Sequence, residues 1–375
     1  MQLTTLGYLV VKLAGTASLA SLYVGFLGAS AAIPVVLLSP LAGVVADRFP
    51  RRRVLLITTS ISVLSALTLG ILVGTHAIAL WSILALEAIR AATQAFDAPA
   101  RQSWVPLLVP PEAVGNAIGL NSIAFNAPSV IGPPIAGYLI LSVGLPTAFY
   151  LNAVLTLAVV LAVANMQPVP PSSRGRESVL ASIAAGFRFL MRHPVLSSVV
   201  LVLAFACVFV RPYVQMLPAY AKHVVGVDAS GLGVLLASTG AGALVGSMLT
   251  AVVANRWRGR VWFASSVLMP LGTIALGFVH DVRAAIPVLA VEGFAVLSFA
   301  GSSNVLLQTL SPAEMRGRAI SVFSMIILGL VPAGSLAMGA LASAIGLSHA
   351  ISAFGVVSLA VAVTVYLRNG ALRRI

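Results

Sequence analysis

The chain has 375 residues, of which 59% are hydrophobic and only 8% charged, and its mean hydropathy is +1.06. About a quarter of the residues in a soluble domain are charged, so these proportions exclude a soluble globular protein, and a disordered chain would be far less apolar. The single cysteine, Cys207, excludes an internal disulfide and cysteine-based metal clusters. The composition therefore indicates an all-α protein embedded in a lipid bilayer.

A helix of about 20 residues crosses the hydrocarbon core of a bilayer. Apolar runs between charged, Pro and Gly residues predict eleven such helices, at 19–46, 53–73, 79–103, 113–143, 146–165, 195–218, 230–254, 261–279, 284–310, 317–344 and 348–367. A shorter apolar run at 4–15 precedes them, and we number it helix 1 of twelve. An internal repeat that pairs VVADRF at 44–49 with VVANRW at 252–257, at an offset of 208, places the first half of this helix before Met1. We favour a late start assignment over a truncated protein.

Basic residues alternate between the loops. Of the 22 Lys and Arg residues, 17 fall in the loops of one side, two (Lys222 and Arg283) in those of the other, and three (Lys12, Arg90 and Arg211) within or beside helices. The positive-inside rule places the crowded side, with the C-terminus, in the cytoplasm. Topology therefore explains the net charge of +13, and nucleic-acid binding is disfavoured. We expect a multi-pass protein of the bacterial inner membrane.

The two halves of the chain repeat each other. The segment PEAVGNA at 111–117 matches AEMRGRA at 313–319 at an offset of 202. Such a repeat predicts two homologous six-helix bundles in parallel orientation. We expect the bundles at 1–165 and 194–375, joined by a cytoplasmic linker at 166–193 whose second part forms an amphipathic surface helix.

The loop after the second helix reads GVVADRFPRRR and ends at Arg53. It resembles the G-x-x-x-D-R-x-G-R-R signature of the major facilitator superfamily, with Pro50 in place of a glycine. The resemblance implies two bundles around a central cavity, lined mainly by helices 1, 4, 7 and 10. If the arginines only fixed topology, Asp47 would have no role. The resemblance assigns five loop residues to a cytoplasmic gate: Gly43, Asp47, Arg48, Arg51 and Arg52.

Helices 4 and 5 carry a second resemblance. The sequences AFDAPARQSWVPLLVPPE and LNSIAFNAPSVIGPPIAG, both within 95–137, are similar to the branch of the superfamily that exports enterobactin, other siderophores and drugs. The run GPPIAG, with Gly132, Pro133 and Gly137, resembles the antiporter motif G-P-x-x-G-G, although Ala136 replaces one glycine. The motif goes with exporters, so the resemblance implies efflux. A kink that serves only helix packing is the alternative.

Ionisable side chains within membrane helices are costly and mark functional sites. Counted from Ala79, Glu87 lies roughly 12 Å and Arg90 roughly 16 Å along helix 4. Their spacing of three residues places them on one face, where a structural salt bridge and a role in transport both fit. The family resemblance places Asp97, at the end of this helix, in the gate, where it would pair with Arg51.

Glu292 lies at nearly the same depth in helix 10, but Ala295 stands where helix 4 has Arg90. Glu292 therefore has no counter-ion on its own helix, and an apolar setting favours its neutral form. A carboxyl group that gains and loses a proton suits coupling to a proton gradient. We predict Glu292, and after it Glu87, as the proton-coupling residue. Structural pairing across helices is the alternative.

Further side chains are candidates for the cavity wall. Arg211, beside Pro212 in helix 7, either attracts an anionic substrate or extends to the outer surface, and the second interpretation is favoured. Polar and aromatic residues of helices 4, 5 and 10 would contact a bulky ligand or join helices. The remaining predicted cavity residues are Arg90, Gln94, Asn121, Phe125, Asn126 and Phe299.

An enzyme is not expected, because the five histidines fall in loops or at helix ends and no H-E-x-x-H, paired-aspartate or G-x-x-x-x-G-K-[ST] motif occurs. The sequence predicts a monomeric secondary transporter without a cofactor or metal. Together with the resemblance, it predicts export of a small amphipathic molecule, such as a drug or siderophore, in exchange for protons. An uptake symporter and a non-transporting scaffold on the same fold are the alternatives.

Overall fold

A computed structural model describes residues 2–104, 108–110, 132, 135–136, 138–140, 142–166, 179–253 and 257–370. These residues are almost all helical, and none of them forms a strand. The principal helices are α1 (Gln2–Leu13), α2 (Ala17–Arg48), α3 (Arg51–Gly74), α4 (Leu80–Trp104), α6 (Leu145–Asn165), α7 (Val179–Arg192), α8 (Pro194–Phe209), α9 (Tyr213–Tyr220), the π-helical turn η3 (Ala221–Val225), α10 (Ala229–Val252), α11 (Arg258–Phe278), α12 (Val282–Thr309), α13 (Ala313–Ile345) and α14 (Leu347–Arg368). Most of the predicted fifth helix lies outside the described residues.

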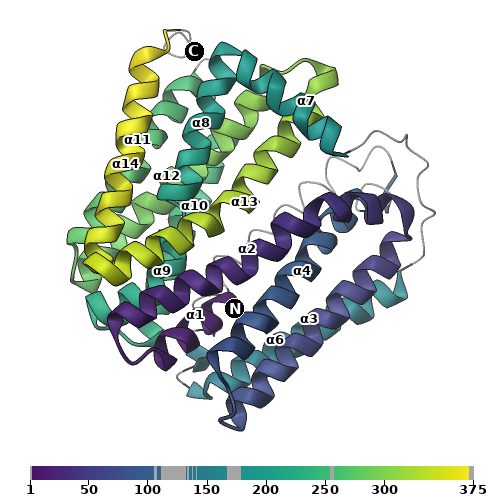
Figure 1. Ribbon diagram of the computed structural model, residues 1–375, viewed down its shortest axis with the longest axis vertical. Helices are drawn as coiled ribbons and strands as arrows, with labels where there is room; N and C mark the ends of the chain where they lie inside the picture. Colours follow the sequence, from purple (N-terminus) through teal and green to yellow (C-terminus); the bar gives the residue numbers. More distant parts are fainter. Residues whose placement is uncertain are drawn as a thin grey trace.

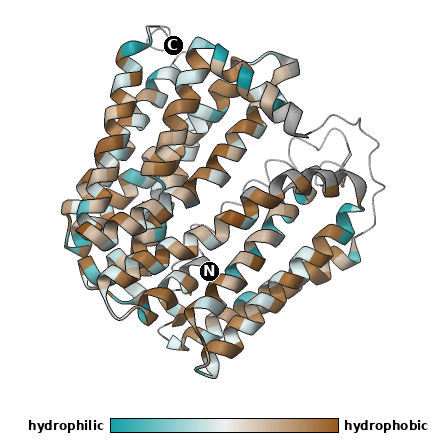
Figure 2. Cartoon of the chain, viewed as in Figure 1, coloured by the Kyte–Doolittle hydropathy of each residue, from teal (hydrophilic) through white to brown (hydrophobic). Residues whose placement is uncertain are grey.

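The helices form two bundles (Figure 1). In the first, α3 packs on α6 and α4, and α2 packs along α4. In the second, α12 packs on α10 and α11, and α11 packs on α14. Nine described segments are long and apolar enough to cross a membrane. Figure 2 shows hydrophobic residues over the outer faces of the long helices and hydrophilic ones mainly at their ends, as lipid contact requires. The predicted all-α membrane fold is confirmed.

Glycines let the helices of the second bundle approach at backbone distance. A Cβ atom added at Gly242 of α10 would lie 1.8 Å from the main-chain oxygen of Ala290 of α12. One added at Gly293 of α12 would lie 2.0 Å from the main-chain oxygen of Thr239 of α10. Small residues drive association of membrane helices by this close packing. The α10–α12 pair is therefore a rigid support for the side chains that α12 carries.

The predicted seventh helix, 195–218, is not continuous. It breaks after Phe209 and resumes at Tyr213 as α9, which continues into the π-helical turn η3. Pro212 lies in the break, and Pro218 lies within α9. Proline has no N–H to donate and its ring crowds the preceding turn, which explains why the helix is interrupted here. Uniform hydrophobicity across this segment concealed the break.

The two bundles meet at one end of the molecule, which we call the closed end. There α1 and the first part of α2 lie beside α9, η3 and the last part of α13 (Figure 1). The Nζ of Lys222 donates to the main-chain oxygen of Val11 (3.3 Å), and the Oγ of Ser18 donates to the main-chain oxygen of Ser343 (3.0 Å). Both hydrogen bonds join the two halves of the chain.

The backbones of α2 and α13 also touch at the closed end. A Cβ atom at Gly339 would lie 2.7 Å from the main-chain oxygen of Ser21 and 3.0 Å from the Cα of Gly25. A Cβ atom at Gly7 of α1 would lie 2.7 Å from the ring of Pro218. These approaches leave no room for a side chain, so the bundles are sealed here by shape.

From this contact the bundles diverge toward the opposite end, which we call the open end (Figure 1). Ile33, Leu37 and Leu41 of α2 are 58%, 68% and 56% exposed as the helix leaves the second bundle. The short helix α7 lies at the open end, packs on α13 and α8, and approaches α2. Leu190 of α7 is buried and Phe187 is 46% exposed, so only part of its predicted apolar face is covered.

The start of α10 offers a test of local stability. The Oδ1 of Asp228 accepts hydrogen bonds from the N–H of Ser230 (3.0 Å), the N–H of Gly231 (3.1 Å) and the hydroxyl of Ser230 (2.6 Å). Bonding of the hydroxyl and the two N–H groups to the charged carboxylate lowers the pKa of Asp228 below its ordinary value of 3.8. The cap thus contributes fully at neutral pH, and its contribution falls as the pH drops through the lowered pKa.

We expect Asp228→Ala to destabilise the protein by about 1 kcal/mol at neutral pH, measured by thermal unfolding in detergent. Asp228→Asn keeps the acceptor oxygen and should lose much less stability. The difference between wild type and Asp228→Asn should shrink as the pH falls below about 3.8. Equal stability of wild type and Asp228→Ala at pH 7 would show that the cap contributes nothing.

Candidate functional site

Glu292 of α12 is completely buried in the second bundle. Its Oε1 lies 2.6 Å from the hydroxyl oxygen of Thr273 on α11, and its Oε2 has no hydrogen-bond partner. The carboxyl group packs beside Gly272, where a Cβ atom would lie 3.2 Å from the Cβ of Glu292. No described residue forms an ion pair with it. A fully charged carboxylate with one unpartnered oxygen is costly in such surroundings.

The contacts of Thr273 indicate which form of Glu292 fits. The hydroxyl oxygen of Thr273 lies 2.6 Å from Glu292 Oε1 and 3.1 Å from the main-chain oxygen of Met269. A hydroxyl has one proton, so a charged carboxylate and the Met269 carbonyl would have to share it in a three-centre bond. Both contacts become full two-centre hydrogen bonds when the carboxylic acid donates to Thr273 and Thr273 donates to Met269. The geometry therefore fits a protonated Glu292.

Two buried tyrosines and one arginine lie at the break in the seventh helix. Tyr213 and Tyr220 of α9 are buried. The hydroxyl of Tyr220 lies 2.6 Å from the main-chain oxygen of Val279 and 3.2 Å from that of Leu276, at the end of α11. Arg211 is half-buried in the break between α8 and α9.

Glu87 of α4 is also completely buried, but it has a partner. Arg90 Nε lies 2.7 Å from Glu87 Oε2, and Arg90 Nη2 lies 2.5 Å from Oε1. Arg90 Nη1 also donates to the Oε1 of Gln94 (3.0 Å). Glu87, Arg90 and Gln94 therefore form one hydrogen-bonded row on one face of α4. The two carboxyl groups of similar depth differ as their neighbours predicted: Glu87 is paired within its helix and Glu292 is not.

Asp97, which the family resemblance pairs with Arg51, forms an ion pair within its own helix. The Oδ2 of Asp97 accepts from Arg101, one turn further along α4, at 2.8 and 3.1 Å. Arg51 is buried at the start of α3. Arg52 donates to the main-chain oxygens of Val163 (3.3 Å) and Ala164 in the last turn of α6. Proximity within α4 favours Arg101, because it reaches Asp97 without help from another helix.

Other predicted site residues have different surroundings. Phe299 is buried against Trp262, with ring centroids 5.6 Å apart. Gly132 is helical and buried. Several side chains that were predicted to belong to the site lie outside the described residues, namely those of Gly43, Asp47, Arg48, Asn121, Phe125, Asn126, Pro133 and Gly137.

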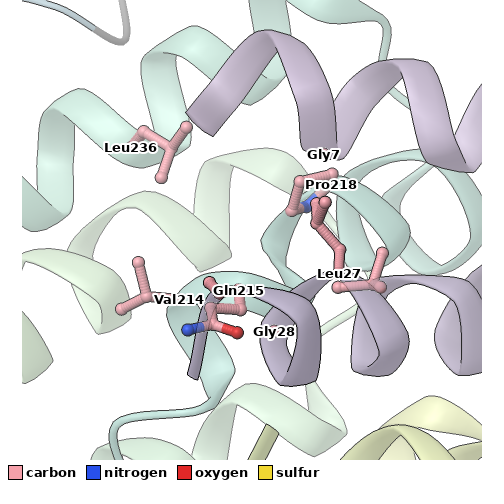
Figure 3. Close-up of a pocket in the computed structure, with 9 residues that line it drawn as sticks. Gly7, Leu27, Gly28, Val214, Gln215, Pro218 and Leu236 are labelled. Atoms are coloured by element: carbon pink, nitrogen blue, oxygen red, sulfur yellow. The ribbon is translucent and has the colours of Figure 1, made fainter. Parts of the chain in front are cut away.

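A small cavity of about 80 Å³ lies between the bundles at the closed end. Figure 3 shows Gln215 of α9 in its wall, among apolar residues of α1, α2, α9 and α10. The Oε1 of Gln215 is buried without a hydrogen-bond partner. None of the predicted site residues lines this cavity. Sequence reasoning also missed Thr273, because a lone threonine in an apolar helix carries no signal until its neighbour is known.

The chain matches a family of known proteins over almost its whole length. The model of a family described as transmembrane secretion effectors matches residues 3–373. The chain belongs to this family. Relatives include the multidrug efflux pump Tap of Mycolicibacterium fortuitum (27% identical over 84% of this chain and 79% of that one) and the staphyloferrin A transporter of Staphylococcus aureus (25% over 94% and 89%). The enterobactin exporter EntS of Shigella boydii is 27% identical over 74% of this chain and 66% of that one.

Solved structures show the same fold. The nucleoside transporter NupG has a TM-score of 0.73 at 14% identity and covers 98% of both chains. A bacterial homologue of Spinster in an inward-facing, occupied conformation has a TM-score of 0.71 at 16% identity, over 99% of this chain and 95% of that one. This secretion effector is thus a multi-pass membrane transporter of the major facilitator type, and the prediction that it is not an enzyme is confirmed.

Proposed function

We propose that this chain exports a small amphipathic molecule from bacteria and takes up protons in exchange. It acts as a monomer in the inner membrane, and its transported molecule is drug-like or siderophore-like. The resemblance to pumps and exporters named for such compounds supports the direction and the substrate class. The buried, ion-pair-free Glu292 supports protons as the coupling ion.

The geometry of Glu292 is the observation that carries the proton coupling. A group that loads and releases a proton must be stable in its neutral form in one conformation and reach water in another. Here both contacts of the Thr273 hydroxyl can be full two-centre hydrogen bonds when Glu292 is the neutral acid. Glu87, paired with Arg90, keeps its charge balanced within α4 and suits this role less.

The charge distribution supports an orientation. Arg51, Arg101, Arg258, Arg318 and Arg368 all lie toward the open end, at helix termini far from the closed-end contacts. Under the positive-inside rule the open end, with the C-terminus, then faces the cytoplasm. In this proposal the open end faces the cytoplasm, and a protonated Glu292 belongs to the state reached after release of substrate outside and return of the transporter.

Efflux from preloaded cells tests the proposal. Cells that express the chain, and matched cells with an empty vector, are loaded with a panel of fluorescent cations and carboxylate-bearing anions. We expect expression to speed loss of at least one dye, and an uncoupler to remove this gain, because the proton gradient drives the exchange. If expression still speeds dye loss in the presence of the uncoupler, proton coupling is contradicted. Faster dye entry, or no change with any dye, would contradict export of such molecules.

A further inference from the structure

The hydrogen-bonded row on α4 has an unused side. A guanidinium has five N–H donors and no acceptor. In Arg90 the Nε–H and one N–H of Nη2 go to Glu87, and one N–H of Nη1 goes to Gln94. Each terminal nitrogen of Arg90 therefore keeps one N–H without a partner among the described residues.

Gln94 adds further donors. Its Oε1 is used to accept from Arg90, which fixes the orientation of the carboxamide. The amide nitrogen of Gln94 then keeps both N–H groups, and no described residue accepts from them. Arg90 and Gln94 together present four N–H donors, and their one side-chain acceptor atom, Gln94 Oε1, already accepts from Arg90. Such a surface matches an acceptor-only group, above all a carboxylate, sulfonate or phosphate.

The donors are accessible and held in place. The side chain of Arg90 is 21% exposed, and Gln94 is exposed, whereas Glu87 beneath them is fully buried. Arg90 lies roughly 15 Å from the start of α4, deep in the membrane. An exposed guanidinium and amide at this depth are costly in lipid, so they open on water inside the protein. The buried carboxylate of Glu87 fixes the guanidinium by two hydrogen bonds, which prepares the site before a ligand arrives.

We propose that Arg90 and Gln94 bind an acidic group of the transported molecule, so that this transporter accepts organic anions and not lipophilic cations. The inference rests on the proposed export function and gives it a substrate class. Glu87 is a positioning residue: it holds the guanidinium and offers nothing to the ligand. A cation would meet donors only and the charge of Arg90, which disfavours it.

Thermal unfolding of the purified full chain in detergent tests this site. The probes are salicylate, its uncharged amide salicylamide and the cation tetraphenylphosphonium, each titrated to obtain an apparent affinity from the shift in Tm. We expect salicylate to raise Tm and the other two to leave it unchanged. Arg90→Gln should weaken the apparent affinity for salicylate about tenfold or more, because it removes a charge-assisted contact. Arg101→Gln changes another arginine of α4 that is paired with a carboxylate. It is the matched control and should keep the wild-type affinity for salicylate.

Two more variants separate binding from helix stability. Glu87→Gln breaks the same ion pair as Arg90→Gln but keeps the donors, so salicylate should still bind. Gln94→Met removes donors at an exposed position that tolerates the change, and should weaken binding about threefold. Equal shifts by salicylamide, no shift by salicylate, or equal losses in Glu87→Gln and Arg90→Gln would overturn the site. Cation efflux without anion efflux would also overturn it but leave the proposed function intact, whereas loss of all gradient-driven efflux would refute the function itself.

Discussion

Glu292→Gln is expected to abolish proton-driven efflux while the protein remains folded. Glutamine has the shape of the neutral acid, and its carboxamide can keep the hydrogen bond to the hydroxyl of Thr273. The variant therefore keeps the packing around Glu292 but cannot release a proton. In the preloaded-cell assay, the part of the efflux that an uncoupler removes should fall to background, while expression and Tm stay close to wild type.

Two variants define the specificity of this effect. Glu87→Gln changes a carboxyl group of similar depth in the other bundle and should keep its dependence on the proton gradient. Thr273→Val removes the hydroxyl that accepts from the acid, so it should slow coupled efflux without abolishing it. The assignment to Glu292 is wrong if Glu292→Gln retains gradient-dependent efflux and Glu87→Gln loses it.

Gly339→Ala should open the closed end. Its Cβ atom would lie 2.7 Å from the main-chain oxygen of Ser21, and main-chain atoms cannot rotate away as a side chain can. The contact of α2 with α13 must therefore loosen, which shifts the population toward the state open on that side. A cysteine introduced at Val24, which is 1% exposed, in a Cys207→Ser background reports this opening. A membrane-impermeant thiol reagent should label it about tenfold faster, a shift of ~1.4 kcal/mol.

The matched control lies on the same helix. A Cβ atom at Gly317 of α13 would meet nothing within 4 Å. Gly317→Ala should leave the labelling rate at Val24→Cys unchanged and stabilise α13 slightly, because alanine is the better helix former. Equal labelling in both glycine variants would mean that the α2–α13 contact does not seal this side.

Much of the fold could be predicted because membrane helices are defined by length and hydrophobicity, which single sequences record directly. Nine described spans and the amphipathic α7 agree with the expected order of elements. The break at Pro212 could not be predicted with equal ease, because proline is tolerated inside many membrane helices and hydropathy does not change across it. Where the two bundles touch depends on the conformational state, which one sequence does not specify.

The candidate site was only partly predictable. Depth and the spacing of three residues were enough to link Glu87 to Arg90, and the absence of a neighbouring cation singled out Glu292. Contacts between helices were harder. The ion pair of Asp97 with Arg101 and the packing of Phe299 on Trp262 were not predicted. A sequence gives the face of a helix but not which neighbour that face meets.

At the closed end, the hydrogen bonds between the two bundles have main-chain oxygens as acceptors, those of Val11 and Ser343. A carbonyl oxygen neither titrates nor changes with the side chain of its residue. The acceptor half of this seal is therefore indifferent to pH and to substitution at Val11 or Ser343. Acidification outside the cell cannot unlock the seal by protonating its acceptors. In the proposed exchange the proton binds at Glu292 of α12, which is not a helix of the seal but packs on α13, one of the helices that form it.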